Sequence, residues 1–353
     1  MKVDYLIIGQ GICGTFLSYY LQKEGKTVLV IDDAGPFSST KVASGVINPV
    51  TGRRVVTTWM IETLLPFAWE AYTEIGEAIN EAIIERKDTI TFPPSFQMKE
   101  TYDKRMSEAG SYINSFEVDS LYKVQFNYLF DPCIIEPTYL INLHLLLKGW
   151  RSKLTESKSV DHSIFDIGLL NVHDDHITYK DITAEKMIFC NGSSTFEYNY
   201  WKNLPYVNNK GQALIVDIPG LSVKNIYKYG ALSLVPWYDG LWWVGSSYEN
   251  EFDTLEPTQG FKDEMINQLK SVLHIPFTII DHFAALRPAT LERRPFVGLH
   301  PQHPALGICN GMGTKGCSLA PYFAKQFADH LVHNKPIEAL ADVQRFRRII
   351  SEV

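Results

Sequence analysis

The stretch VDYLIIGQGICG, residues 3–14, decides the fold of this 353-residue chain. Its apolar run at residues 3–8 predicts a strand that is buried on both faces, as in a parallel sheet. Glycines follow directly, and Ile12, Phe16 and Tyr20 then recur at helical spacing until Gly25 ends the pattern. A β-branched run at residues 27–31 predicts the next strand, so the first thirty residues form one βαβ unit.

Three glycines in this turn have the spacing of a dinucleotide site. Gly9 permits the tight turn, Gly11 lets a pyrophosphate approach the backbone, and Gly14 lets the helix pack against the strand. The helix start at Ile12 and Cys13 offers unpaired N–H groups and the positive end of the helix dipole to phosphates. A glycine-rich turn that binds no ligand is the alternative.

Two acidic residues, Asp32 and Asp33, stand at the end of the second predicted strand. A carboxylate at this place accepts hydrogen bonds from the hydroxyl groups of a ribose. The motif therefore predicts a dinucleotide, but by itself it does not separate NAD from FAD.

The composition is that of an acidic globular enzyme, with 45% apolar and 21% charged residues. Its length favours two packed domains. The 33 basic and 40 acidic residues give a net charge of −7, which disfavours nucleic acid as a partner without excluding it. Five scattered cysteines without a CxxC pair indicate reduced thiols in a cytoplasmic protein. Polar residues interrupt the apolar segment 139–150, and a membrane span needs about 20 apolar residues, so no membrane span is expected.

Farther along the chain, the pattern alternates between helical and antiparallel stretches. Helices are predicted over residues 61–87, 137–154, 258–273 and 319–334, and short strands over 160–189. Antiparallel strands are predicted at 212–218, 231–235 and 241–245, the last two joined by a turn at 236–240. We therefore expect an α/β, Rossmann-type dinucleotide-binding domain, made of residues 1–85, 137–205 and 284–353. An α+β substrate domain with an antiparallel sheet, residues 86–136 and 206–283, is expected to interleave with it.

Four further blocks carry a family resemblance. They are SSTKVASGVINP at residues 38–49, MIFCNG at 187–192, AALRPAT at 284–290 and NGMGTKGCSLAP at 310–321. Together with the opening unit, they resemble the D-amino-acid oxidase, glycine oxidase and sarcosine oxidase superfamily of flavoproteins over nearly the whole chain. The resemblance implies FAD as the cofactor, because ordinary NAD dehydrogenases lack a second glycine-rich helix start near the C-terminus.

The resemblance also implies which residues wrap the cofactor. The second block surrounds the ribityl chain and flavin ring, the backbone of Val160 holds adenine, and the last block lies against the pyrimidine end of the flavin. We interpret Cys317 as a packing residue, and covalent attachment of the flavin stays open. Beyond the opening unit, the implied residues are Ala43, Ser44, Gly45, Val46, Asn48, Val160, Cys190, Asn191, Gly192, Gly313, Thr314, Lys315, Gly316, Cys317 and Ser318.

Four side chains are candidates for substrate chemistry. Arg287 matches the arginine that grips a substrate carboxylate in glycine oxidases, and the alternative is a structural salt bridge. Backbone N–H groups of residues 314–318 would stabilise negative charge on the reduced flavin, where Lys315 either adds a positive charge or points to water. Arg53 or its neighbour Arg54 faces the ring, and Tyr248 lines the pocket or its rim.

The expected activity is oxidation of the C–N bond of a small carboxylate-bearing amine or amino acid by hydride transfer to FAD. Water then hydrolyses the imine, and oxygen or another acceptor reoxidises the flavin. The segments VGSSYE, at 244–249, and GTKGCSLAP, at 313–321, look most like the oxidase domain of a bifunctional tRNA wobble-uridine-modifying enzyme. A tRNA-modifying oxidase that acts on a carboxymethylaminomethyl group is therefore the alternative, and a flavin-binding protein without catalysis is a third. No metal is expected, because His173 and His176 lie in a polar turn.

Overall fold

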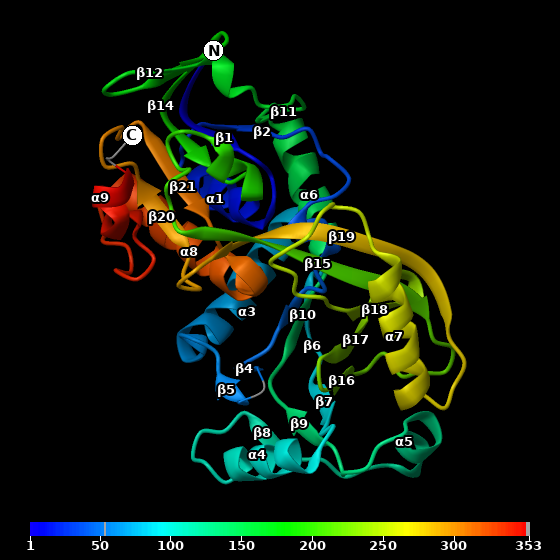
Figure 1. The fold of residues 1–353 in the computed structure, drawn as a ribbon. Coiled ribbons are helices and arrows are strands. Elements are labelled where there is room, and N and C mark those ends of the chain that lie inside the picture. The colour runs from blue at the N-terminus through cyan, green and yellow to red at the C-terminus, as the bar shows by residue number, and fades with distance from the viewer. Residues whose placement is uncertain (53, 351–353) are drawn as a thin grey trace.

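The computed structural model describes residues 1–52 and 54–350, and it begins with the predicted βαβ unit. This unit consists of β1 (Lys2–Ile8), α1 (Ile12–Lys23) and β2 (Val28–Ile31). β1 lies between β2 and β14 (Ile182–Phe189) and runs parallel to both (Figure 1). The prediction from the opening stretch is confirmed.

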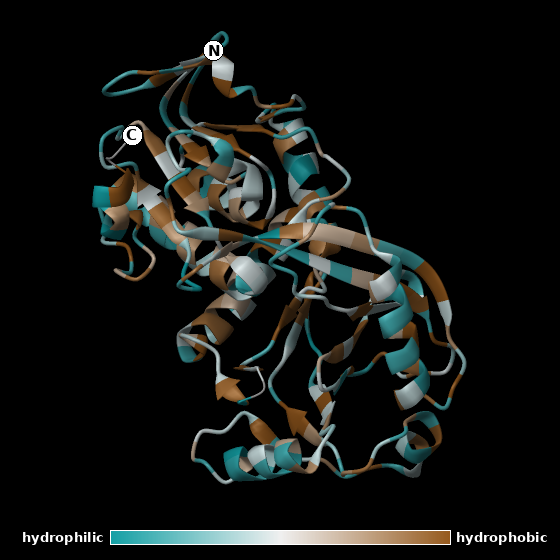
Figure 2. Cartoon of the chain, viewed as in Figure 1, coloured by the Kyte–Doolittle hydropathy of each residue, from teal (hydrophilic) through white to brown (hydrophobic). Residues whose placement is uncertain are grey.

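The first sheet has the strand order β11-β2-β1-β14-β13-β12, with β21 paired to β14 and β20 paired to β21. Alternate β1 side chains pack into two different cores, so both faces of the sheet are buried, and Figure 2 shows its apolar strands inside the molecule. Helices α1, α3, α6 and α8 cover one of these faces. The remaining elements here are β11 (Val160–Asp161), β12 (Leu170–Val172), β13 (Ile177–Tyr179), β20 (Phe296–Leu299), β21 (Leu306–Asn310), α3 (Ile61–Ile79), α6 (Leu143–Glu156), α8 (Gly316–His333) and α9 (Arg347–Ile350).

The second sheet has the order β19-β15-β18-β17-β16-β7-β9-β8 and is antiparallel except where β16 pairs with β7. Its two long strands, β15 and β19, run from the first sheet into the second half of the molecule (Figure 1). Helix α7 (Gln259–Val272) covers one face of this sheet. The strands are β7 (Thr89–Phe92), β8 (Ile113–Ser115), β9 (Cys133–Ile135), β15 (Tyr206–Asp217), β16 (Ile226–Tyr229), β17 (Leu232–Pro236), β18 (Trp242–Gly245) and β19 (Thr278–Thr290).

A three-stranded sheet of order β3-β10-β6 closes the other face of the second sheet. Leu140 of β10 and Val46 of β3 pack against Trp243 of β18. The elements are β3 (Val46–Ile47), β6 (Ile84–Arg86) and β10 (Tyr139–Ile141), with a hairpin of β4 (Val50–Thr51) and β5 (Val56–Thr57) beside them. Short helices complete the fold: α2 (Ser39–Val42), α4 (Phe96–Met106), α5 (Ser120–Gln125), η1 (Ile167–Leu169), η2 (Gly192–Glu197), η3 (Tyr238–Gly240), η4 (Gly313–Lys315) and η5 (Val343–Phe346).

Two predicted helices are shorter than their apolar patterns. The helix expected over residues 61–87 ends at Ile79, because Asn80 is left-handed with φ 59° and residues 84–86 pair with β10 as a strand. The helix expected over residues 137–154 starts only after β10, where the Asn142 side chain accepts a hydrogen bond from Leu145 N. The predicted helices near residues 259–272 and 316–333 are confirmed, as is the turn at 236–240.

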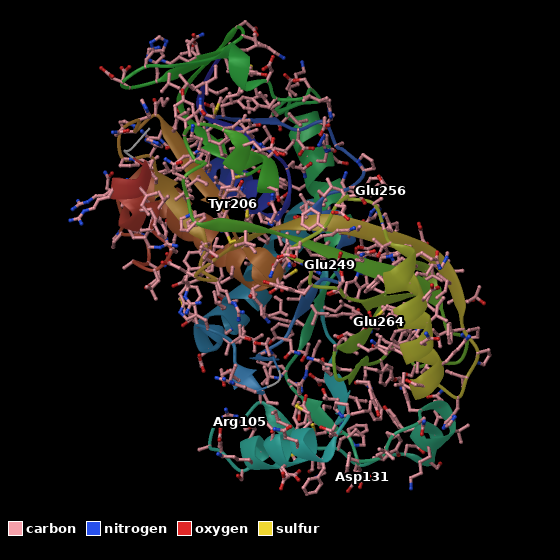
Figure 3. All side chains as sticks on the ribbon, in the orientation of Figure 1. Arg105, Asp131, Tyr206, Glu249, Glu256 and Glu264 are labelled. Carbon is pink, nitrogen blue, oxygen red and sulfur yellow. The ribbon has the colours of Figure 1, made fainter. Side chains whose placement is uncertain are left out.

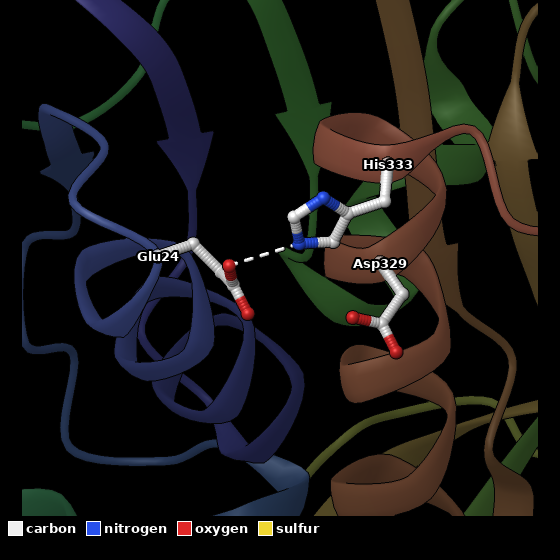
Figure 4. Close-up of side chains that lie close together, drawn as sticks. All are labelled: Glu24, Asp329 and His333. Atoms are coloured by element: carbon white, nitrogen blue, oxygen red, sulfur yellow. Dashed lines mark hydrogen bonds and ion pairs between the residues drawn. The ribbon is translucent and has the colours of Figure 1, made fainter.

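Helices α1 and α8 lie side by side, and an exposed ion-pair network joins their C-terminal ends. The Glu24 carboxylate lies 2.9 Å from His333 Nε2, with Asp329 beside it (Figure 4). Lys325 Nζ is 2.6 Å from one Asp329 oxygen, and Lys335 Nζ is 3.5 Å from the other. The carboxylate of Asp329 is therefore neutralised by lysines, and we interpret the group as a salt-bridge network.

Membrane insertion through a helix has no support here. Over residues 1–52 and 54–350, no helix combines the length and the apolar character that a bilayer span requires.

Candidate active site

The first glycine turn has the geometry of a phosphate cradle. Gly9 has φ +95°, and a Cβ atom on Gly14 would lie 1.9 Å from the carbonyl oxygen of Gly9. A Cβ on Gly11 would lie 3.3 Å from Thr40 Oγ1, which is a tight contact, so a side chain at this position would crowd the Thr40 hydroxyl. The N-cap residue of α1, Gly11, has no side chain, and Ile12 N donates to Thr40 Oγ1 at 3.2 Å. The N–H groups that follow in the first turn lie at the positive end of the helix dipole, where an anion can bind.

The Asp32 carboxylate lies beside this turn and already accepts hydrogen bonds from three donors. Its carboxylate accepts from Gln10 N at 2.7 Å and from Ala34 N at 2.8 Å, and it forms an ion pair with Arg151. A carboxylate accepts about four hydrogen bonds, so one position is left for a ribose hydroxyl. Asp33 is exposed and caps the following turn. The sequence analysis missed Arg151, because it comes from α6, far along the chain.

Val160 lies on β11, the edge strand next to β2. Val30 N donates to Ser159 O at 2.9 Å, and Asp32 N donates to Asp161 O at 3.0 Å. In this parallel register, the peptide groups of Val160 itself point to the open edge of the sheet. This placement supports the predicted contact with adenine.

The predicted loop of residues 38–49 packs between the two large sheets. Thr40 Oγ1 accepts a hydrogen bond from Ile12 N at 3.2 Å, and Trp243 Nε1 of the second sheet donates to Val42 O at 3.0 Å. Gly45 has φ +80°, and a Cβ there would lie 2.2 Å from a backbone oxygen, so the loop requires glycine at this position. The loop and the strand after it also carry the predicted residues Ala43, Ser44, Val46 and Asn48.

The end of β14 meets the first glycine turn from the other side. A Cβ on Gly9 would lie 2.7 Å from Asn191 Cα, so the two backbones are in contact. Asn310 Nδ2 donates to Gly192 O at 2.8 Å and ties the end of β14 to β21. Cys190 is buried, and this burial raises the pKa of its thiol. The thiol is therefore neutral, as for a packing residue.

The C-terminal glycine turn lies beside the N-terminal one. A Cβ on Gly316 would lie 3.8 Å from Ile12 Cγ2, which brings the start of α8 next to the start of α1. Gly313 is left-handed with φ +56°, and no side chain caps α8. Burial raises the pKa of the Cys317 thiol to about 12, which agrees with a packing role. The turn also carries Thr314, which is exposed, and Ser318, which is buried.

Arg287 lies on β19, on the sheet face opposite α7. Its Nη1 donates to Asn209 Oδ1 at 2.6 Å and to Ser247 O at 3.1 Å. Its guanidinium lies over Gly211, where a Cβ would be 2.0 Å from Nη2. Burial lowers the pKa of Arg287, and within the described ranges it has no carboxylate partner. The alternative of a structural salt bridge is therefore not observed.

One acidic residue, Glu249, and one aromatic residue, Tyr248, lie near Arg287, and the Glu249 carboxylate forms no ion pair with it. Glu249, labelled in Figure 3, accepts a hydrogen bond from Gln212 Nε2 at 2.7 Å instead. The guanidinium carbon of Arg287 lies 6.0 Å from the ring centroid of Tyr248, which is 58% exposed. Tyr248 therefore lies at the rim. Arg54 is exposed, and Arg53 lies outside the described residues.

Lys315 is half-buried and does not simply point to water. Burial, and then repulsion from Lys228, lowers its pKa to about 8. Lys228 lies on β16 and was missed by the sequence analysis. The only signal for it was a two-residue alternation with Ile226, in a strand too short to predict.

These residues fit a flavin dinucleotide. The starts of α1 and α8 adjoin, glycines form the turn before each of them, and an acid with one acceptor position lies at the end of β2. The Arg287 guanidinium, which has no ion-pair partner among the described residues, lies on the face of the second sheet opposite α7. Such a site can bind two phosphates, a ring and a small anion together.

Comparisons with known proteins give the family. A family model described as FAD dependent oxidoreductase (DAO) matches residues 4–330. Glycine oxidase of Bacillus licheniformis is 23% identical over 356 residues, covering 94% of both chains. The structure of glycine oxidase from Bacillus cereus ATCC 14579 has a TM-score of 0.82 at 16% identity and covers 96% of this chain and 97% of that one. Iminodiacetate oxidase from Chelativorans sp. BNC1 has a TM-score of 0.74 at 19% identity and covers 95% and 97%. The chain therefore belongs to the DAO family of FAD-dependent oxidoreductases.

Proposed function

We propose that this enzyme oxidises the C–N bond of a small amine or amino acid that carries a carboxylate. The observation that carries the proposal is Arg287, a half-buried guanidinium on the sheet face that the loop of residues 38–49 covers, with no ion-pair partner among the described residues. Removal of a hydride from the carbon next to nitrogen leaves an imine, which water hydrolyses. The glycine oxidases similar to this chain support the amino-acid class.

FAD, when bound, supplies the acceptor for the two electrons of the hydride. Gly9, Gly11 and Gly14 would admit its pyrophosphate to the α1 N-terminus, with Asp32 toward the ribose and Val160 toward adenine. The start of α8 would place N–H groups and the positive helix end beside the flavin ring.

The role of Arg287 is to bind and orient the substrate. Asn209 and Ser247 hold Nη1, while Nη2 lies over Gly211 and has no hydrogen-bond partner among the described residues. A guanidinium held this way grips a carboxylate bidentately, which fixes the direction of the neighbouring C–H bond. Trp243 and the surrounding apolar cluster exclude water from the same face.

A tRNA-modifying oxidase is the second candidate. The segment 244–249, which resembles that enzyme, carries Ser247 and the rim residue Tyr248 beside Arg287. A carboxymethylaminomethyl group has the same chemistry, a secondary amine with a carboxylate. We also keep the prediction of a cytoplasmic location, which five unpaired thiols support.

The test is anaerobic bleaching of the bound flavin by a panel of N-methyl amino acids, D- and L-amino acids, and carboxymethylaminomethyl nucleosides. We expect at least one small amino acid to bleach it, and peroxide release in air identifies oxygen as the acceptor. Bleaching by the nucleoside alone favours the second candidate. A flavin that no member of the panel reduces contradicts both.

A further inference from the structure

One exposed segment of the chain lies beside Arg287. Residues 246–257, all of them described, connect β18 to α7 without forming a helix or strand, and most of them are exposed. Ser247 O of this segment accepts a hydrogen bond from Arg287 Nη1, and Tyr248 lies at the rim of the site. We call residues 246–257 the rim segment. Because an exposed segment has few buried apolar contacts, other interactions must fix its position.

Buried polar side chains of β15 hold the rim segment. Lys210, which is 1% exposed, donates from Nζ to Thr254 O at 2.9 Å and to Glu256 O at 2.7 Å. Its backbone also exchanges two hydrogen bonds with that of Glu249, at 2.8 and 3.0 Å. Gln212, equally buried, donates from Nε2 to the Glu249 carboxylate at 2.7 Å. The rim segment is therefore tied to β15 by polar contacts along most of its length.

The ammonium group of Lys210 is buried without an acidic partner. Among residues 1–52 and 54–350 it forms no ion pair, and its Nζ bonds go to backbone oxygens of the rim segment. Lysine is almost never fully buried unless it is paired, because an ammonium loses its hydration there. An apolar side chain would fill the same space at a lower cost in hydration. The two hydrogen bonds to the rim segment are therefore the reason for a lysine at this position.

The rim segment and Arg287 are held from opposite faces of β15. Side chains alternate along a strand, so Asn209 lies on the Arg287 face and its neighbour Lys210 on the α7 face. Asn209 Oδ1 accepts from Arg287 Nη1 at 2.6 Å, and its Nδ2 donates to Asn250 Oδ1 of the rim segment at 3.1 Å. Displacement of the rim segment would therefore remove Ser247 O from Nη1 and also release Asn209.

We propose that Lys210 is a positioning residue for the carboxylate anchor: it fixes the rim segment, and the rim segment in turn fixes Arg287. The inference rests on the proposed function, in which Arg287 binds the substrate carboxylate. Without the ammonium, Thr254 O and Glu256 O lose their donor, and the rim segment samples positions in which Ser247 O does not contact the guanidinium. An anchor that is competent for only a fraction of the time binds its ligand more weakly by that fraction.

The first experiment measures amide hydrogen exchange in the holoenzyme. Lys210→Met keeps the length of the side chain and removes its charge. We expect the amides of Ser247 and Glu249, which donate to β15, to exchange roughly tenfold faster or more than in the wild type. Lys186→Met is the matched control, because Lys186 Nζ also donates to a backbone oxygen, Pro304 O, at 3.0 Å. It should leave the rim segment unchanged. Wild-type exchange of the rim segment in Lys210→Met overturns the proposal.

The second experiment separates positioning from a general structural defect. Acetate, a carboxylate that the enzyme cannot oxidise, is titrated against the flavin absorption, and its Kd should rise roughly tenfold in Lys210→Met. In anaerobic bleaching by a carboxylate-bearing amine, Kd should rise by the same factor. The limiting rate should change less than about threefold, because a bound carboxylate holds the arginine in place. An amine without a carboxylate should keep its Kd, and equal losses for both amines contradict the positioning role.

A second variant keeps the test open if Lys210→Met does not fold. Asn250→Ala removes one tie of the rim segment at an exposed residue, and it should weaken acetate binding in the same direction. Unchanged acetate binding in this variant contradicts control of the anchor by the rim segment. Acetate binding that depends on Lys210 in an enzyme that no amine reduces sustains the inference and contradicts the proposed function. Amine oxidation together with unchanged acetate binding in Lys210→Met does the reverse.

Discussion

The guanidinium of Arg287 occupies the space that a side chain at position 211 would fill. This explains why a glycine stands opposite Ala285 in the long β15–β19 ladder, where a larger residue would otherwise suit a strand. The arginine is thus positioned by its neighbour on β15, and by Asn209 and Ser247, before any substrate arrives.

Gly211→Ala tests this positioning. The added Cβ would lie 2.0 Å from Nη2, so the flexible end of Arg287 must move, while the backbone can stay. We expect kcat/KM for a carboxylate-bearing amine to fall roughly tenfold, equivalent to about 1.4 kcal/mol, with the melting temperature little changed. An amine without a carboxylate serves as the internal control. Equal losses for both amines would refute the positioning.

Among the elements, the opening βαβ unit was predictable because its signals are local. The tight turn, the close helix–strand contact and the acid at the strand end each require a particular residue within a few positions. The end of α3 and the start of α6 were not predictable in this way. There residues 84–86 and 139–141 fit a helix as well as a strand, and the pairing of these two segments with each other decides the outcome.

The same limit applies to the candidate site. Arg287 and Lys315 were found through motifs, whereas Lys228 and Arg151 carry no motif. Lys228 gains its place from strands that bring it onto the inner face, and Arg151 from a helix that returns to β2. Contacts between distant segments give such residues their roles, and one sequence does not record these contacts.

A pair of glycine substitutions tests the packing of α1 as an element. Both Gly14 and Gly260 lie in the first turn of a helix, but a Cβ on Gly14 would lie 1.9 Å from a backbone oxygen, and one on Gly260 has nothing within 4 Å. Gly14→Ala should lower the free energy of unfolding by about 1–3 kcal/mol and weaken FAD retention. Gly260→Ala should leave both unchanged or stabilise by roughly 0.5–1 kcal/mol. Chemical denaturation and flavin content measure the two. A Gly14→Ala protein that keeps its flavin and stability would contradict the close packing.

At the scale of the whole molecule, the two ends of the chain come together, and we propose that they build one cofactor site. The glycine turn at residues 9–14 and the turn at 311–316 come together through the packing of α1 on α8, and the ion-pair network of Figure 4 joins the far ends of the same helices. Arg287 lies on β19, which pairs with β15 along the two long strands that both halves share. In the proposed site, cofactor and substrate therefore meet where the two sheets adjoin.

The central claim is that Arg287 anchors a carboxylate-bearing amine for oxidation at this site. The most direct measurement is the rate of anaerobic flavin bleaching by the best amine of the panel, in the wild type, Arg287→Ala and the control Arg105→Ala, a half-exposed arginine on α4 that pairs with Glu108 (Figure 3). We predict a loss in kcat/KM of at least about a hundredfold for Arg287→Ala, from a charge-assisted bidentate contact, and no change for Arg105→Ala. An Arg287→Ala enzyme that bleaches as fast as the wild type would contradict the account.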